Sequence, residues 1–88
     1  MCKSVLLVGV RNWATKRLLR RLERHGVVCE AKQIQDRPLI LTTVKTKNFG
    51  WLLWFIEKIN RIPRIEFVEP LIVSCPKKEL SGKSNYFQ

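Results

Sequence analysis

Apolar residues recur along the chain in six segments, four with patterns typical of strands and two with helical spacing. The first segment, Ser4 to Val10, is apolar on both faces, which is typical of a central strand. The second strand segment is less apolar and favours an edge, and Pro70 places the last strand at an edge as well. The expected strands are residues 4–10, 27–35, 39–46 and 64–73, and the expected helices are residues 13–25 and 49–62.

Local signals at the element boundaries support this division. Asn12 can cap the first helix, and Gly26 lies where a left-handed residue would end it. The turn at residues 36–38 is short, so the strands on either side of it form an antiparallel hairpin. Pro63 ends the second helix.

The element order β-α-β-β-α-β with right-handed crossovers predicts an α+β, ferredoxin-like sandwich. Four antiparallel strands form its sheet, and both helices lie on one face. Eighty-eight residues suit one domain, and a hydrophobic fraction of 45% is enough for a core. We expect a ferredoxin-like domain over residues 1–75 and a flexible, basic C-terminal tail over residues 76–88.

The stretch from Arg37 to Val73, which ends in EKINRIPRIEFVEPLIV, resembles the end of small regulatory domains of the leucine-responsive regulator type. In that family a helix ends in an Ile-Pro turn that leads into an edge strand. Glycine normally follows the proline there, whereas this chain has Arg64. Those regulators also carry a helix-turn-helix domain, for which this chain has no room. The resemblance therefore implies the ferredoxin-like fold and leaves the function open.

The charge balance points to anionic partners. Seventeen Lys and Arg against seven Asp and Glu give a net charge of +10, which fits nucleic acid, an anionic membrane or an acidic protein. The longest apolar run, residues 49–56, is too short for a membrane span, so no membrane partner is expected. Cys2, Cys29 and Cys75 are an odd number with no close pair, and no signal peptide precedes them. These features predict a cytoplasmic protein with reduced cysteines, of which Cys29 and Cys75 are buried in strands.

The first helix concentrates the positive charge. At about 100° per residue, its cationic side chains fall on one arc, with Trp13 in the middle and leucines on the other side. An anionic partner such as the nucleic-acid backbone would relieve the repulsion between like charges one turn apart. The alternative is a solvated face that serves only solubility. The cationic residues are Lys16, Arg17, Arg20, Arg21 and Arg24.

The second helix places tryptophan on its polar side. Trp54 lies opposite the core stripe, between Lys58 and Arg61, and Trp51 lies beside Lys58. A large apolar surface in water usually marks an interface. Three uses are open: contact with a protein, stacking on a nucleic acid, and cover by the tail.

Catalytic and metal-binding motifs are missing from the sequence. The one histidine, His25, and the one aspartate, Asp36, fall at the ends of different elements, so no nucleophile-base arrangement is expected. No paired Cys or His spacing predicts a metal, and the glycines are isolated. The central strands also lack the aromatic residues with which RNA recognition motifs stack bases. We expect neither an enzyme nor a cofactor.

The leading hypothesis is a structural RNA-binding protein of the ribosome or another ribonucleoprotein, in contact with structured RNA, most plausibly rRNA, and neighbouring proteins. The predicted nucleic-acid-binding residues are Arg11, Trp13, Lys16, Arg17, Arg20, Arg21, Arg24, Lys45, Lys47, Lys77 and Lys78. The predicted protein interface is Trp51, Trp54, Lys58 and Arg61.

Two further hypotheses use the same residues differently. One is a protein-binding adaptor, inhibitor or dimeric regulatory domain, including one encoded by a virus, in which the Trp54 face makes a homodimer. The other is an architectural DNA-binding protein, for which no groove-reading element can be named.

Overall fold

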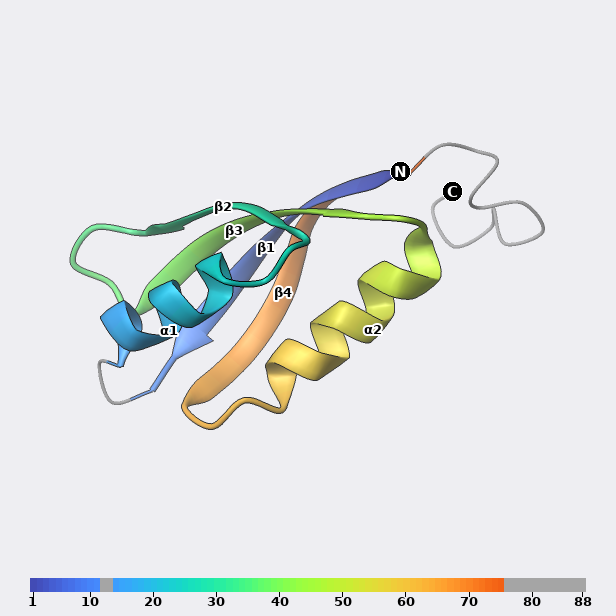
Figure 1. The fold of residues 1–88 in the computed structure, drawn as a ribbon. Helices are drawn as coiled ribbons and strands as arrows, with labels where there is room; N and C mark the ends of the chain where they lie inside the picture. The colour runs from blue at the N-terminus through green and yellow to red at the C-terminus, as the bar shows by residue number, and fades with distance from the viewer. Residues whose placement is uncertain (12–13, 76–88) are drawn as a thin grey trace.

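The computed structural model of the protein describes residues 1–11 and 14–75 (Figure 1). The chain alternates strands and helices in the order β-α-β-β-α-β that the sequence predicted. The elements are β1 (Cys2–Val10), α1 (Thr15–Glu23), β2 (Val28–Gln33), β3 (Leu39–Thr46), α2 (Phe49–Asn60) and β4 (Ile65–Ser74).

The four strands form one antiparallel sheet in the order β2-β3-β1-β4, and both helices pack on the same face of it (Figure 1). Leu6 of β1 lies opposite Thr42 of β3, and Val8 lies opposite Ile40. The predicted ferredoxin-like fold is therefore confirmed, with β2 and the proline-containing β4 at the edges. We call the side of the sheet under the helices the covered face and the other side the open face.

The hydrophobic core lies between the covered face and the two helices. Leu6 and Val8 on β1 and Ile40 on β3 have no exposed surface. Each buried side chain of this size stabilises the fold by about 1.5–3 kcal/mol. The helices contribute their inward stripes, which are Leu18 and Leu22 of α1 and Leu52, Phe55 and Ile59 of α2.

The ends of α1 differ from the sequence prediction. The residue before the helix is Ala14, which makes no side-chain cap, and Asn12 lies outside the described residues. At the other end Arg24 keeps a right-handed conformation, and the φ of Gly26 lies outside the left-handed region, so the predicted left-handed cap at Gly26 is wrong. The helix ends through tighter bonds instead, because the amides of Arg24 and His25 donate to carbonyls three residues earlier.

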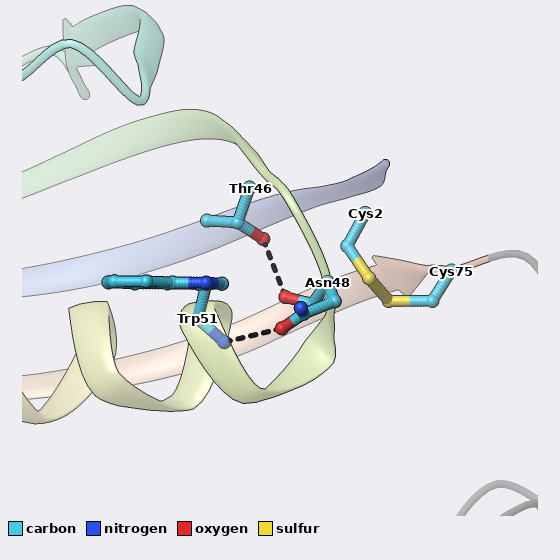
Figure 2. Close-up of a disulfide and its surroundings, with 5 residues drawn as sticks. All are labelled: Cys2, Thr46, Asn48, Trp51 and Cys75. Carbon is cyan, nitrogen blue, oxygen red and sulfur yellow. Dashed lines mark hydrogen bonds between the residues drawn. A yellow bond between two sulfur atoms is a disulfide. The ribbon is translucent and has the colours of Figure 1, made fainter. Parts of the chain in front are cut away.

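The start of α2 is capped by a side chain. The Asn48 carboxamide oxygen accepts a hydrogen bond from the Trp51 amide at 3.0 Å (Figure 2). Asn48 has an extended backbone, and its carbonyl accepts from the Thr46 hydroxyl at 3.2 Å. These bonds fix the turn from β3 into α2. Within residues 1–11 and 14–75, no helix has the length and apolar composition needed to cross a membrane.

Among the residues that the structure describes, two non-glycine residues have left-handed backbone conformations. Asp36 (φ 58°) lies in the β2–β3 turn, and Arg64 (φ 74°) lies in the turn before β4. Arg64 occupies the place where the resembling regulators have glycine, the residue that enters this conformation without steric cost. The Arg64 carbonyl accepts from the Arg11 amide at 2.7 Å, and the Arg11 side chain forms an ion pair with Glu66 at 3.7 Å. These contacts tie the strained turn to the end of β1.

A disulfide joins the two ends of the described domain. Lys3 lies opposite Ser74 in the β1–β4 ladder, so the neighbouring Cys2 and Cys75 meet and bond to each other (Figure 2). For Cys2 and Cys75 the expectation of unpaired cysteines was wrong, because sheet pairing brings together residues that are far apart in the sequence. Cys29 was expected to be buried, but it is exposed on the edge strand β2, at a break in the pairing with β3.

Candidate functional site

The cationic side chains of α1 gather as the helical spacing predicted. All five are exposed and line one shallow hollow along the outer side of the helix. Within residues 1–11 and 14–75, none of the five forms an ion pair with an acidic side chain. We call Lys16, Arg17, Arg20, Arg21 and Arg24 the cationic row.

The other predicted nucleic-acid-binding residues do not extend this row. Arg11 is engaged with Glu66 on β4. Lys45 is exposed on the open face, because its neighbours Val44 and Thr46 are buried on the covered face. Lys47 lies beyond the strand, next to the tryptophans of α2. The remaining predicted residues, Trp13, Lys77 and Lys78, lie outside the described residues.

The two tryptophans of α2 form an exposed pair. Their rings meet edge to face, with centroids 5.5 Å apart, and each side chain is about half exposed, at 51% for Trp51 and 52% for Trp54. The Lys58 ammonium lies 4.9 Å from the Trp54 ring centroid, within the range of a cation–π contact. The Arg61 guanidinium forms an ion pair at 2.6 Å with the carboxylate of Glu57, one helical turn earlier. Leu53, which the sequence prediction did not include, is as exposed as the tryptophans.

A hollow lies between this pair and the end of α1. Its wall continues from the tryptophans to Phe55, whose ring meets His25 edge to face at 5.5 Å. Burial lowers the pKa of His25 below its usual value, and the nearby charges of Lys58 and Arg21 lower it further. We call this concavity the aromatic hollow, and its lining residues are His25, Gly26, Val27, Thr46, Lys47, Trp51, Trp54, Phe55 and Lys58.

The open face is a surface that the sequence prediction missed. No helix of the described residues packs on it, yet its centre is aliphatic and partly exposed. Phe67 of β4 lies across Gly9 so closely that a Cβ at Gly9 would overlap the ring. The signal was present in β1, because an apolar pattern on both sides of a strand requires cover on both sides. The apolar residues are Val5, Leu7, Leu41, Phe67 and Ile72, together with Thr43.

The rim of the open face carries charges of both signs. Glu30 and Lys32 lie on β2, with the Lys32 ammonium 3.4 Å from the Glu30 carboxylate. Glu69 lies on β4, opposite Leu7 of β1. Lys3 and Lys45 lie opposite each other at the far end of the β1–β3 ladder. This mixture differs from the outer side of α1, where the cationic row has no acidic partner within the described part of the chain.

Comparison with known proteins gives a fold and no family. No family model matches the chain, and no curated protein matches it. Among solved structures, the hypothetical protein PHS023 from Pyrococcus horikoshii has a TM-score of 0.76 and 21% identity, over 86% of this chain and 92% of its own. The structure named FFRP-DM1 has the same TM-score and identity, over 84% of this chain and 99% of its own.

The shared property is the fold. FFRP-DM1 is a relative of the leucine-responsive regulators, so this match agrees with the resemblance of residues 37–73 to their domains. At 21% identity the match does not assign a partner or a ligand to the present chain.

Proposed function

We propose that this chain is a small regulatory domain that acts as a dimer, in which the open face of the sheet binds a second copy. The observation that carries the proposal is the aliphatic open face, where Ile72 is 60% exposed. Contiguous apolar surface of this kind is uncommon on monomers and marks interfaces. The similarity to FFRP-DM1 supports a regulatory domain rather than a ribosomal protein.

The distribution of charge also favours this mode of pairing. A net charge of +10 makes two copies repel each other, so a dimer needs its positive surfaces kept apart. Contact through the open faces leaves the cationic row of each copy on the outside, because α1 packs on the covered face. The mixed charges around the open face allow opposite charges to meet across the interface.

The test is the oligomeric state of single variants by sedimentation equilibrium. We expect the native chain to be dimeric at micromolar concentration and Ile72→Lys to be monomeric, because a buried unpaired charge opposes association. Ile72 is exposed in the monomer, so circular dichroism of this variant should stay native. The matched control is Trp54→Lys, which should remain dimeric.

Two outcomes would overturn the open-face dimer. If the native chain is monomeric at about 100 μM, the open face is not covered by a second copy. A dimer that Trp54→Lys disrupts and Ile72→Lys leaves intact would move the interface to the α2 tryptophans, as the sequence hypothesis had it.

A second candidate function is binding of a polyanion by the cationic row. The observation that favours it is the gathering of five exposed cations on one side of α1, which form no ion pair with an acidic residue of ranges 1–11 and 14–75. We expect affinity for structured RNA to fall steeply between about 50 and 200 mM salt. Arg17→Ala and Arg20→Ala should each reduce the salt slope by about one unit, whereas Arg37→Ala in the β2–β3 turn should not. An unchanged slope in both α1 variants would remove this candidate.

The remaining sequence hypotheses stay predictions. A matched DNA duplex in the same titration distinguishes the ribonucleoprotein hypothesis from an architectural DNA-binding protein. The proposed function includes no catalytic step, cofactor or metal. A cytoplasmic location is likewise only a prediction, and the disulfide of Cys2 and Cys75 counts against it, because such bonds are usual in oxidising compartments.

A further inference from the structure

The aromatic hollow has the features of a small-molecule site. It lies between α2 and the loop that joins α1 to β2, on the opposite side of the sheet from the proposed dimer interface. The Trp51 ring lies on the side of α2 that faces Thr46 at the end of β3 (Figure 2). The cavity volume is about 250 Å³, just below the usual range for pockets that hold drug-sized ligands, and suits a molecule with a single ring.

The walls of the hollow are flat and apolar. Trp51 and Trp54 meet at an interplanar angle of 81°, so a ring that stacks on one of them presents its edge to the other. His25 and Phe55 meet at 79° and form a second aromatic corner. Phe55 is buried and belongs to the core, which fixes the position of this corner.

The charged side chains that line the hollow are both positive. Lys47 and Lys58 line it, and none of the described residues that line it is acidic. The lowered pKa of His25 leaves its imidazole neutral at pH 7, with nitrogens able to hydrogen-bond. A ligand's ammonium group would find no carboxylate here, whereas a carboxylate would find two ammonium groups.

We propose that the aromatic hollow binds a small aromatic carboxylate, with its ring against Trp51 and Trp54 and its carboxylate between Lys47 and Lys58. The ring contributes the apolar contact, and the carboxylate replaces solvent counterions at the two lysines. Both halves of the ligand are required, because the lysines are exposed and their attraction alone is weakened by solvent and salt.

The proposal does not depend on the dimer. The hollow is formed within one chain, so Ile72→Lys should bind the ligand as the native chain does. Loss of dimerisation and loss of ligand binding are therefore separate results, and either proposal can fail while the other holds.

The experiment is a titration of the full chain with phenylacetate, followed through the tryptophan indole N–H signals in ¹H–¹⁵N spectra. We expect saturable shifts of the Trp51 and Trp54 signals. Three matched probes dissect the recognition: acetate lacks the ring, 2-phenylethanol lacks the charge, and phenethylamine reverses it. Each should bind at least about tenfold more weakly, since both the ring and the carboxylate contribute to affinity.

Variants assign the binding to the hollow. Lys47→Gln and Lys58→Gln should each weaken phenylacetate binding about fivefold or more, and Trp54→Leu should weaken it further by removing one wall. Arg37→Gln removes the same charge at the far hairpin and should leave the affinity unchanged. Absence of saturable shifts, binding of acetate as tight as that of phenylacetate, or equal loss in Arg37→Gln would each overturn the proposal.

Discussion

The two faces of the sheet have nearly the same amino-acid types but opposite environments. Leu6 and Leu7 are neighbours on β1, yet Leu6 is fully buried beneath the helices and Leu7 is only half-buried on the open face. On β3, Ile40 and Leu41 differ in the same way. The difference lies in what covers each face, because apolar residues on an uncovered face indicate a partner that the monomer does not supply.

The largest expected effect comes from the disulfide, which ties β4 to β1. Closing a loop over 73 residues stabilises the fold by about 4 kcal/mol in the chain-entropy model. We expect the double variant Cys2→Ser, Cys75→Ser to lose a large part of this stabilisation, measured as the free energy of unfolding in urea. Hydrogen exchange should increase first in β4, the strand that carries Phe67 and Ile72 of the open face. Cys29→Ser is the control and should unfold as the native chain does; equal destabilisation there would argue against a stabilising Cys2–Cys75 bond.

The neighbouring leucines test the comparison directly. We expect Leu6→Ala to lower the free energy of unfolding by about 2–5 kcal/mol, because it opens a cavity in the core. Leu7→Ala should cost clearly less in a dilute monomer, since its side chain is already partly in water. At concentrations where the chain is dimeric, the cost of Leu7→Ala should rise. Equal costs for both variants at every concentration would mean that the open face is covered within the monomer.

A smaller effect is expected at the turn that leads into β4. Arg64 has φ 74°, a left-handed conformation that costs a side-chain-bearing residue about 1–2 kcal/mol. Arg64→Gly should therefore raise the free energy of unfolding by about 0.5–1 kcal/mol, since the greater freedom of unfolded glycine offsets part of the relief. Arg64→Ala keeps the strain and should bring no such gain. The same urea titrations measure both variants.

The smallest effect concerns His25 on the helix side of the sheet. Its pKa is lowered in the folded chain by burial and then by Lys58 and Arg21, so the unfolded chain binds its proton more readily. The contribution of His25 to stability should therefore be fully present above the ordinary pKa of 6.5 and should decline as the pH falls below it. His25→Gln should flatten this part of the stability profile between about pH 7.5 and 5.5. A profile that is unchanged in the variant would assign the pH dependence to other groups.

The elements of the fold followed from the sequence because their signals are local. The continuous apolar run of β1 and the helical spacing of Leu52, Phe55 and Ile59 each depend on near neighbours. The element order and the right-handed crossovers added the topology. The left-handed conformation of Arg64 was not predicted, although the sequence showed that Arg64 stands where the resembling regulators have glycine. The ends of α1 were less predictable, because Gly26 can also occupy an ordinary loop conformation.

The functional surfaces followed only in part. Helical spacing was enough to group the cationic row, because all its members lie on one helix. The disulfide and the aromatic hollow join distant segments, so no short-range spacing could group Cys2 with Cys75 or His25 with Trp54. Lys45 and Lys47 were grouped by their closeness in the sequence. The strand β3 ends at Thr46, so Lys45 lies on the open face, whereas Lys47 lies beyond the strand, next to the tryptophans of α2.

The bond between Cys2 and Cys75 has a topological consequence. It holds Cys2, the first residue of the sheet, and Cys75, the residue after its last strand, 4.3 Å apart between Cα atoms, so the described fold enters and leaves at a single point. A fold with adjacent ends can be inserted into a surface loop of a host protein without stretching either partner. The β2–β3 turn lies at the end of the sheet away from the disulfide, and it is then the natural place to open a circular permutant.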